Sequence, residues 1–280
     1  MSIKLIADSG STKTDWCLLD GNKKIKVVTQ GISPYFLNSS QLSEILRIEL
    51  LPKLKKKLPQ EVFYYGTGCS NPANVAMIKK SIKSVFPDAK INVDHDLSGA
   101  ARALCGNEKG IACILGTGSN SCYYNGKKIV KNSPGLGYVL GDEGSGAYLG
   151  KNVLRHYLYN TFDPDLMDRF NTTYKLTRSE ILDDVYKKPL ANRYLAGFAG
   201  FLVDNRGHYM IENIIEDGIN DFFYNHLYKY TESWKYPIHF TGSIAYGFRD
   251  VLKSLCDAYE LELGKVLKAP MEGLIEYHGI

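Results

Sequence analysis

The sequence predicts an α/β protein built from two similar halves, each a mixed β-sheet covered by helices. Short apolar runs of strand length alternate with segments whose apolar residues are spaced three and four apart, as on one face of a helix. Two strand–turn–strand units, starting near residues 3 and 110, are rich in glycine and hydroxyl residues. Each leads into a hairpin signal, Asp20-Gly21 in one and Asn125-Gly126 in the other. This correspondence indicates an internal duplication.

The first half is predicted to begin with three strands and to continue with alternating helices and strands. The strands lie at 3–8, 15–19 and 25–30. A helix near 40–51 is expected to end before Pro52, because proline breaks a helix interior. The helix at 74–86 is supported by Val75, Ile78 and Ile82, which share one helical face. The remaining elements are strands at 62–65 and 89–93 and a helix at 97–105.

The second half is predicted to begin in the same way, with strands at 110–115, 119–124 and 127–131. A helix follows Gly144, and residues 160–235 are expected to be mainly helical. The last predicted elements are a strand at 237–241, a helix at 245–259, a strand at 263–267 and a helix at 271–278. We therefore expect an N-terminal domain at 1–108 and a C-terminal domain at 109–280 with a helical insertion. The last helix is expected to pack back on the first domain.

Composition narrows the classes of function. The chain has 280 residues, of which 44% are hydrophobic, as in globular proteins. The net charge of +4 is modest, and no motif predicts a nucleic-acid partner. No signal pattern and no apolar run of about 20 residues is present, so we expect a cytoplasmic protein without a membrane partner. The six cysteines form no C-x-x-C pair, which favours buried thiols in a reducing compartment.

Two turns carry residues that suit phosphate binding. The first lies within residues 8–15 and follows the apolar run at 3–7, and the second lies at 116–120 and follows the run at 111–115. Small residues leave backbone N–H groups able to point at an anion, and hydroxyl groups add donors. One such turn is more often only a hairpin, but two at matching positions favour phosphate binding. Asp8, at a strand end, is suited to hold Mg²⁺ through water.

A third turn of this kind, at Thr241-Gly242-Ser243, completes a pattern that resembles a known superfamily. A duplicated ββαβαβα unit with a D-x-G-x-T turn and a G-T-G-S turn is similar to actin, the sugar kinases and the 70-kilodalton heat-shock proteins. Within it, the chain most resembles the N-acetylglucosamine kinase and BadF/BadG/BcrA/BcrD ATPase branch. The segments that carry this closer resemblance are 93–100, 115–120 and, as the most specific, 135–146. The resemblance spans the chain and implies two ribonuclease H-like, actin-like ATPase domains with an active-site cleft between them.

The resemblance also implies an activity and its cofactors. It implies an ATP-dependent kinase that uses Mg²⁺ and phosphorylates a hydroxyl group of an amino sugar, with N-acetylglucosamine as the favoured substrate. The first turn would hold the β-phosphate, the second the γ-phosphate, and the third the adenosine. The implied nucleotide-binding residues are Asp8, Gly10, Ser11, Thr12, Lys13, Gly116, Thr117, Gly118, Ser119, Gly242 and Ser243.

By the same resemblance, Asp96 is the base that accepts the proton of the sugar hydroxyl. From the residues alone Asp96 is also a good helix N-cap, and Asp94, on the same face of the strand, is the alternative base. Tyr35 stands where related kinases can place a sugar-binding asparagine, and Asn38 is its alternative. The implied substrate-binding residues are Asp96, Ser119, Asn120, Gly135, Gly137, Asp142 and Tyr35.

Other functions stay open at this point. One is an ATPase activator of a CoA-linked dehydratase or reductase, which would carry an iron–sulfur cluster, although no cysteine has a clear cluster context. Another is a non-catalytic, nucleotide-dependent regulator or scaffold. For the loop at 135–146, Asp142 or Ser145 is also a candidate cap of the following helix. A homodimer is a candidate assembly.

Overall fold

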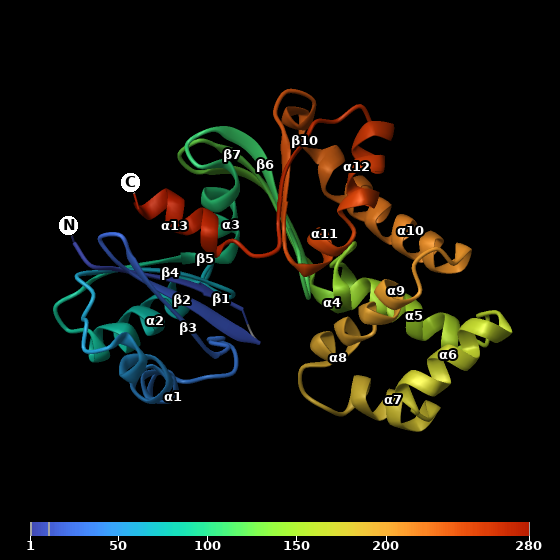
Figure 1. Ribbon diagram of the computed structural model, residues 1–280, viewed down its shortest axis with the longest axis horizontal. Helices are drawn as coiled ribbons and strands as arrows, with labels where there is room; N and C mark the ends of the chain where they lie inside the picture. Colours follow the sequence, from blue (N-terminus) through green and yellow to red (C-terminus); the bar gives the residue numbers. More distant parts are fainter. Residues whose placement is uncertain (1, 11, 280) are drawn as a thin grey trace. The chain divides into compact units, whose positions relative to one another are not determined.

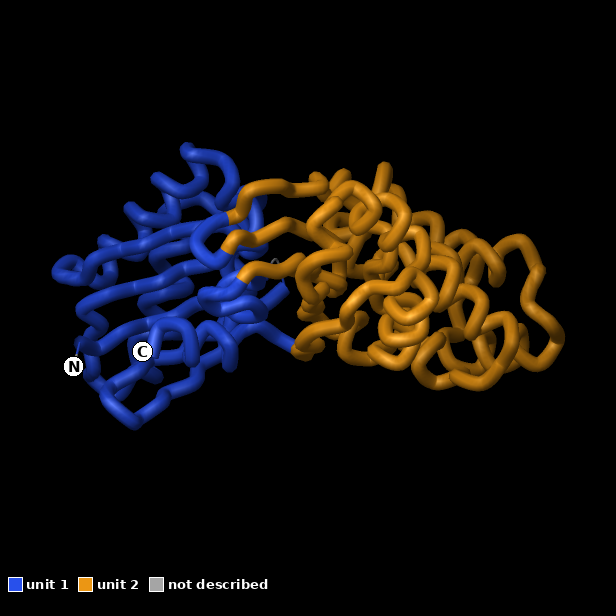
Figure 2. Tube along the Cα trace, turned by 90° about the horizontal axis from the view of Figure 1, so that it is seen from above, with its two compact units in different colours: residues 1–108, 126–128, 269–280 blue, residues 109–125, 129–268 orange. Residues whose placement is uncertain are grey.

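A computed structural model describes residues 2–10 and 12–279 of the chain, which divides into two compact units. Unit 1 comprises Met1–Glu108, Gly126–Lys128 and Ala269–Ile280, and unit 2 comprises Lys109–Asn125 and Ile129–Lys268 (Figure 2). Unit 1 is therefore made of three separate stretches of chain, and its last stretch carries the final helix.

Unit 1 is built on a five-stranded mixed sheet of strand order β3-β2-β1-β4-β5. The first three strands are joined by antiparallel pairing, and the last two run parallel to β1. The strands are β1 (Lys4–Ser9), β2 (Lys13–Asp20), β3 (Lys23–Gln30), β4 (Glu61–Gly66) and β5 (Lys90–His95). All five strands that the sequence predicts for this half are present.

Helices cover both faces of this sheet (Figure 1). One face packs on α1 (Ser39–Ile45) and α2 (Pro72–Val85), and the other on α3 (Asp96–Cys105) and α13 (Met271–Gly279). The two faces follow from the alternation along β1, where Leu5 belongs to the first core and Ile6 to the second.

The helix that the sequence predicts to end before Pro52 continues as helical turns beyond this residue in the structure. After α1 the chain passes through a π-helical turn, Leu46–Leu50, and a 3₁₀ turn, Leu51–Leu54. Pro52 lies in the first turn of that last segment, where a missing N–H group breaks no helical hydrogen bond. The expected stop at Pro52 is therefore wrong.

Unit 2 repeats the same sheet topology, with strand order β10-β9-β6-β7-β8. Strands β6, β7 and β8 pair antiparallel, whereas β9 and β10 run parallel to β6. The strands are β6 (Lys109–Leu115), β7 (Ser119–Asn125), β8 (Ile129–Ser133), β9 (Ile238–Thr241) and β10 (Leu263–Leu267). The predicted duplication is confirmed by this match.

The long connection between β8 and β9 is helical, as the sequence predicts, and its aromatic residues form much of the core of unit 2. The helices are α4 (Gly137–Leu140), α5 (Gly146–Leu158), α6 (Pro164–Tyr174), α7 (Arg178–Tyr186), α8 (Ala191–Gly197), α9 (Ala199–Asp204) and α10 (Tyr209–Asn225). The helix expected at 245–259 is split at Phe248 into α11 (Ser243–Gly247) and α12 (Arg249–Ala258). Within the described residues, no helix is long and apolar enough to cross a membrane.

A substitution at Gly150 in α5 can test the close packing of this helical region. A Cβ atom at Gly150 would lie 1.9 Å from the carbonyl oxygen of Leu195, which belongs to α8. We expect Gly150→Ala to destabilise the protein by about 1–3 kcal/mol, because backbone must move to accept the methyl group. The free energy of unfolding in urea measures this.

Gly200, in α9, provides the matched control, because a Cβ atom there meets open space. Gly200→Ala should be neutral or stabilise the protein by up to about 1 kcal/mol, the usual difference in helix propensity. Equal unfolding energies for the two variants would contradict the packing of α5 on α8.

Candidate active site

The first turn lies in unit 1 between β1 and β2. The N–H group of Gly10 donates to the carbonyl oxygen of Lys13 at 3.0 Å, and this closes the turn. At its base the hydroxyls of Ser9 and Thr14 are 2.8 Å apart and buried. Thr12 and Lys13 are exposed on the turn, whereas Ser11 lies outside the described residues. The turn is thus held by hydrogen bonds at its base, and Thr12 is exposed at its surface.

Asp8 lies beside this turn, and its surroundings destabilise the charged form of its carboxyl group. Burial first, and then the charges of Asp15 and Asp96, raise the pKa of its carboxyl from 3.8 to about 7, although Lys13 acts to lower it. Asp15 is directly opposite Asp8 in the β1–β2 pairing, and its carboxylate is 2.7 Å from the Lys13 ammonium. Lys13 therefore offsets the acidic pair, in addition to any contact with phosphate.

A divalent cation fits the chemistry of this acidic region. Mg²⁺ usually takes one or two carboxylates, with waters and substrate phosphates as its other ligands. Asp8 and Asp15 are oxygen donors whose mutual repulsion such a cation would relieve. Among residues 2–10 and 12–279, no group of three His, Cys, Asp or Glu side chains forms a complete metal site. The donor set therefore fits a partly hydrated Mg²⁺ ion rather than a protein cage.

Asp96 begins α3 at the end of β5, but it is not the cap of that helix. The N-cap is His95, whose Nδ1 accepts from the N–H group of Ser98 at 3.3 Å. Asp96 is the first helical residue, and its Oδ1 accepts from the N–H group of Leu97 at 2.8 Å. Burial raises the pKa of the Asp96 carboxyl. The capping role that the residues alone suggested for Asp96 is therefore wrong.

The alternative acid, Asp94, is already engaged by neighbouring groups. One of its oxygens is 3.3 Å from the guanidinium of Arg102, and the other accepts from the N–H group of His95 at 2.9 Å. The two carboxylates thus differ in surroundings: Asp94 is paired with a cation, whereas Asp96 is desolvated at the N-terminus of a helix.

The second turn, in unit 2, rests on the first turn of α5. Carbonyl oxygens of Gly116 and Thr117 accept from the N–H groups of Gly146 and Ala147 at 2.8 and 3.1 Å. The Ser119 hydroxyl is buried and has no hydrogen-bond partner within the described part of the chain. Since such a group costs free energy unless it is paired, it fits a ligand with acceptor oxygens such as a phosphate.

Asp142 lies against this second turn. Its Oδ1 accepts from the N–H group of Ser119 at a long 3.5 Å, and its Oδ2 would be 2.9 Å from a Cβ atom placed on Gly118. Burial raises the pKa of the Asp142 carboxyl. Ser145, rather than Asp142, caps α5 by accepting from the N–H group of Tyr148. The side chain of Asp142 is therefore directed to the turn and not to the helix.

Two glycines and an asparagine surround Asp142. A Cβ atom on Gly135 would be 2.9 Å from the carbonyl oxygen of Ser119, so only glycine allows that close approach. Gly137 has open space around it but φ +76°, so glycine is favoured there by the backbone conformation rather than by packing. The Asn120 Oδ1 accepts from Asn132 at 2.9 Å. The structure thus brings Asn120, Gly135 and Asp142 together around the second turn.

The third turn adjoins the second one. Gly242 has φ +125°, and a Cβ atom there would be 2.1 Å from the carbonyl oxygen of Leu115. Ser243 is exposed at the start of α11. The hydroxyl of Thr241 is buried without a hydrogen-bond partner in the described residues. Glycine is therefore required for the two turns to lie side by side.

Tyr35 and Asn38 have different roles in unit 1. The Tyr35 side chain is 64% exposed, and its ring lies 2.7 Å from where a Cβ atom of Gly68 would be. Asn38 caps α1: its Oδ1 accepts from the N–H group of Gln41, and its own N–H group donates to the Gln41 side chain. Asn38 is thus occupied by the helix and is a poor alternative to Tyr35.

Sequence reasoning missed three residues that the structure adds to these sites: Asp15, Thr241 and Arg102. Asp15 could have been found from the hairpin itself, because Asp8 and Asp15 are equally far from the centre of the turn. Thr241 was placed in the third turn but was not named among the binding residues. No sequence pattern links Arg102 to Asp94, because the contact depends on how α3 returns along β5.

Comparison with known proteins places this chain among the sugar-kinase relatives. A proposed N-acetylglucosamine kinase from Porphyromonas gingivalis is 42% identical, with a TM-score of 0.94 over 98% of both chains. The chain belongs to the N-acetylglucosamine kinase-like family. No protein-family model matches the sequence. The full-length match confirms the predicted α/β fold class with its two duplicated parts.

Two further relatives extend the family comparison. The N-acetylmuramic acid/N-acetylglucosamine kinase of Clostridium acetobutylicum is 31% identical over 166 residues, which cover 56% of this chain and 53% of that enzyme. The chain thus matches about half the length of this curated relative. A second proposed N-acetylglucosamine kinase, from Chromobacterium violaceum, shares the fold with a TM-score of 0.77 over 99% of both chains, at 15% identity.

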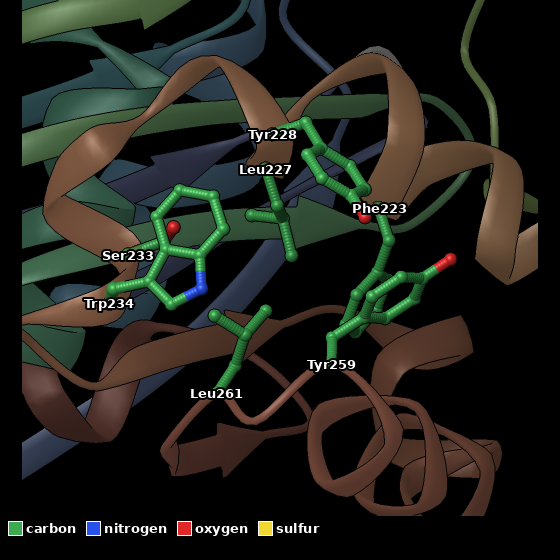
Figure 3. Close-up of a pocket in the computed structure, with 7 residues that line it drawn as sticks. All are labelled: Phe223, Leu227, Tyr228, Ser233, Trp234, Tyr259 and Leu261. Carbon is green, nitrogen blue, oxygen red and sulfur yellow. The ribbon is translucent and has the colours of Figure 1, made fainter.

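One small cavity in unit 2 contains none of the predicted site residues. It has a volume of about 40 Å³, and apolar and aromatic side chains converge on it (Figure 3). This volume accommodates water rather than a sugar. Its lining residues are Phe223, Leu227, Tyr228, Ser233, Trp234, Tyr259 and Leu261.

The raised pKa of Asp8 gives a prediction about stability. Because the folded-state pKa of about 7 lies above the usual 3.8, ionising Asp8 costs stability, and the protein loses stability as pH rises from about 4 to about 7. Asp8→Asn should therefore raise the melting temperature at pH 8, by about 2–4 °C for each kcal/mol regained. Near pH 4 the difference should vanish.

Melting curves of both proteins in EDTA, with no divalent cation present, measure this effect. Asp88→Asn is the matched control, since Asp88 is exposed, and it should leave the melting temperature unchanged at both pH values. An Asp8→Asn protein that is less stable than the parent at pH 8 would contradict the raised pKa of Asp8.

Proposed function

We propose that the protein is an ATP-dependent amino-sugar kinase, which transfers the γ-phosphoryl group of Mg-ATP to a hydroxyl group of N-acetylglucosamine. Membership of the family supports the sugar class. The observation that carries the chemistry is Asp96, a desolvated carboxylate that is not tied to a cation and lies close enough to Asp8 to raise its pKa. A phosphoryl-transfer site needs such a base beside its phosphate-binding groups.

Asp96 is the proposed base. It would accept the proton of the sugar hydroxyl as that oxygen attacks the γ-phosphorus atom, and it would orient the hydroxyl beforehand. Its raised pKa makes it a stronger proton acceptor than an exposed aspartate. Asp94 is less suited because Arg102 pairs with it at 3.3 Å. Asp94 would instead fix the start of α3, where Asp96 lies.

The three turns are proposed to hold the nucleotide. Thr12 and the amides of the first turn would bind the β-phosphate, and Thr117 with the buried hydroxyl of Ser119 would bind the γ-phosphate. Gly242 and Ser243 would contact the adenosine. Asp8, through water, and Asp15 would hold Mg²⁺. A bound Mg²⁺ would neutralise charge that builds on the phosphoryl oxygens.

The sugar would be recognised largely from unit 2. Asp142 is the proposed acceptor of hydrogen bonds from vicinal sugar hydroxyls, which a carboxylate binds well. Its loop is anchored by Glu143, whose carboxylate is 3.4 Å from Nε2 of the buried His226. Gly135 and Asn120 line the same region, and Tyr35 would contribute an aromatic surface from unit 1.

A panel of sugars incubated with Mg-ATP tests this function. The panel contains N-acetylglucosamine, N-acetylmuramic acid, N-acetylmannosamine and glucose, and ADP release with product mass is the measurement. We expect the largest kcat/KM for an N-acetylated amino sugar. Phosphorylation of glucose alone would overturn the amino-sugar assignment, and ADP release without any phosphorylated sugar would overturn the kinase.

Asp96→Asn tests the proposed base. Asparagine keeps the size of the side chain but cannot accept the proton, so kcat should fall about 100-fold or more. The melting temperature should stay the same or rise, because a desolvated charge is removed. Asp94→Asn is the matched comparison and should cost less in kcat. A stable Asp96→Asn protein with full turnover would assign the base to another residue.

A further inference from the structure

Unit 1 contains a second, larger cavity, of about 470 Å³, beside the edge strand β5. Pockets of about 300–1,000 Å³ hold small-molecule ligands. Side chains from β4, β5, α3 and α13 form most of its wall, and these elements lie together in Figure 1. The lining residues are Phe63, Tyr64, Tyr65, Lys79, Asn92, Val93, Asp94, Arg102, Tyr277 and His278.

The ionisable groups of this cavity favour an anion. Arg102 and Lys79 are cations, and Asp94 is the one lining carboxylate. Burial and the nearby Arg102 lower the pKa of His278 to about 4, so this side chain is neutral at pH 7. The lining thus carries two cations and one carboxylate, and this net positive charge favours an incoming anion.

The cationic side of the cavity is held firmly in place. One guanidinium nitrogen of Arg102 donates to the Tyr65 hydroxyl at 2.7 Å, and the same nitrogen is 3.3 Å from Asp94. The Tyr65 hydroxyl is in turn 2.8 Å from Nε2 of His278, which stacks on Phe63 with ring centroids 3.9 Å apart. A preorganised guanidinium loses little entropy when it binds an oxyanion.

We propose that this cavity is a second ligand site, which binds a small phosphate monoester and most specifically a sugar phosphate. The planar guanidinium of Arg102 matches phosphate geometry, and the exposed lining residue Lys79 adds a point charge. The amide of Asn92 and the hydroxyl of Tyr277 are suited to sugar hydroxyls. The preference for phosphate rests on the cavity itself, whereas the choice of a sugar rests on the proposed function.

The cavity is connected to the site of Asp96 through α3. Asp96 is the first residue of this helix, and Arg102 lies on it. A phosphate bound to Arg102 would compete with Asp94 for the guanidinium. Removing the Asp94 charge should therefore strengthen ligand binding, whereas removing either cation should weaken it. This opposite response is a property that an unspecific surface site would not have.

Isothermal titration with N-acetylglucosamine 6-phosphate, and separately with inorganic phosphate, tests the site at low salt. Lys79→Gln should raise the Kd about two- to fivefold, as expected for one exposed charge. Arg102→Gln should raise it about tenfold or more, since a charged hydrogen bond is lost. Asp94→Asn should lower it. The sugar phosphate should bind more tightly than inorganic phosphate.

Two control variants separate this cavity from the phosphate turns. Lys80→Gln removes an exposed lysine next to Lys79 that does not line the cavity, and Thr117→Ala alters the second turn. Lys80→Gln should leave all binding unchanged, and Thr117→Ala should leave the Kd of the Lys79-dependent site unchanged while weakening only binding at the second turn. Lys79→Gln keeps the proposal testable if Arg102→Gln does not fold, because the Lys79 side chain is at the surface.

The outcomes distinguish this proposal from the proposed kinase activity. A Kd that is unchanged in Lys79→Gln, or raised by Thr117→Ala alone, would overturn the second site. Equal affinity for inorganic phosphate and the sugar phosphate would overturn the sugar assignment. Binding that depends on Lys79 in a protein without kinase activity would support the site while the proposed function fails.

Discussion

The in-register parallel pairing of β1, β4 and β5 is the constraint on which the site in unit 1 depends. It places Asp8, Tyr65 and Asp94 in one row across the sheet, and their side chains share one face. The antiparallel partner β2 adds Asp15 to the same row. Acidic groups are thereby concentrated near the carboxyl ends of β1, β4 and β5, where water is partly excluded. Lys13 and Arg102 are the cations that offset this charge.

Unit 2 uses the same sheet topology with different chemistry at the strand ends. Strands β6 and β9 end at Leu115 and Thr241, which carry no charge. The acid of this unit, Asp142, comes from a loop instead and lies against the second turn. The duplicated scaffold is therefore acidic at the strand ends in one copy and neutral in the other. The acidic strand ends of unit 1 suit a carboxylate base, and the uncharged strand ends of unit 2 suit a turn that binds an anion.

Local patterns in the sequence were sufficient for the strands, most helices and the three turns. Apolar spacing and glycine positions act within a few residues, so they can be recognised without the rest of the fold. Features set by distant contacts were not recognised in this way. His95, rather than Asp96, caps α3, and Pro52 continues a helical segment. The pairing of Arg102 with Asp94 needs α3 to fold back along β5 before the two side chains meet.

The return of α13 to unit 1 has a consequence for the order in which the protein is made. The face of the sheet that contains Ile6 and Cys17 packs against Leu274 and its neighbours on α13. On the ribosome the part of this apolar face that α13 covers, beside α3, stays exposed while all of unit 2 is being synthesised, and such exposed surface favours association with other chains. Unit 1 begins before unit 2 along the chain, yet it is complete only after unit 2 has been made.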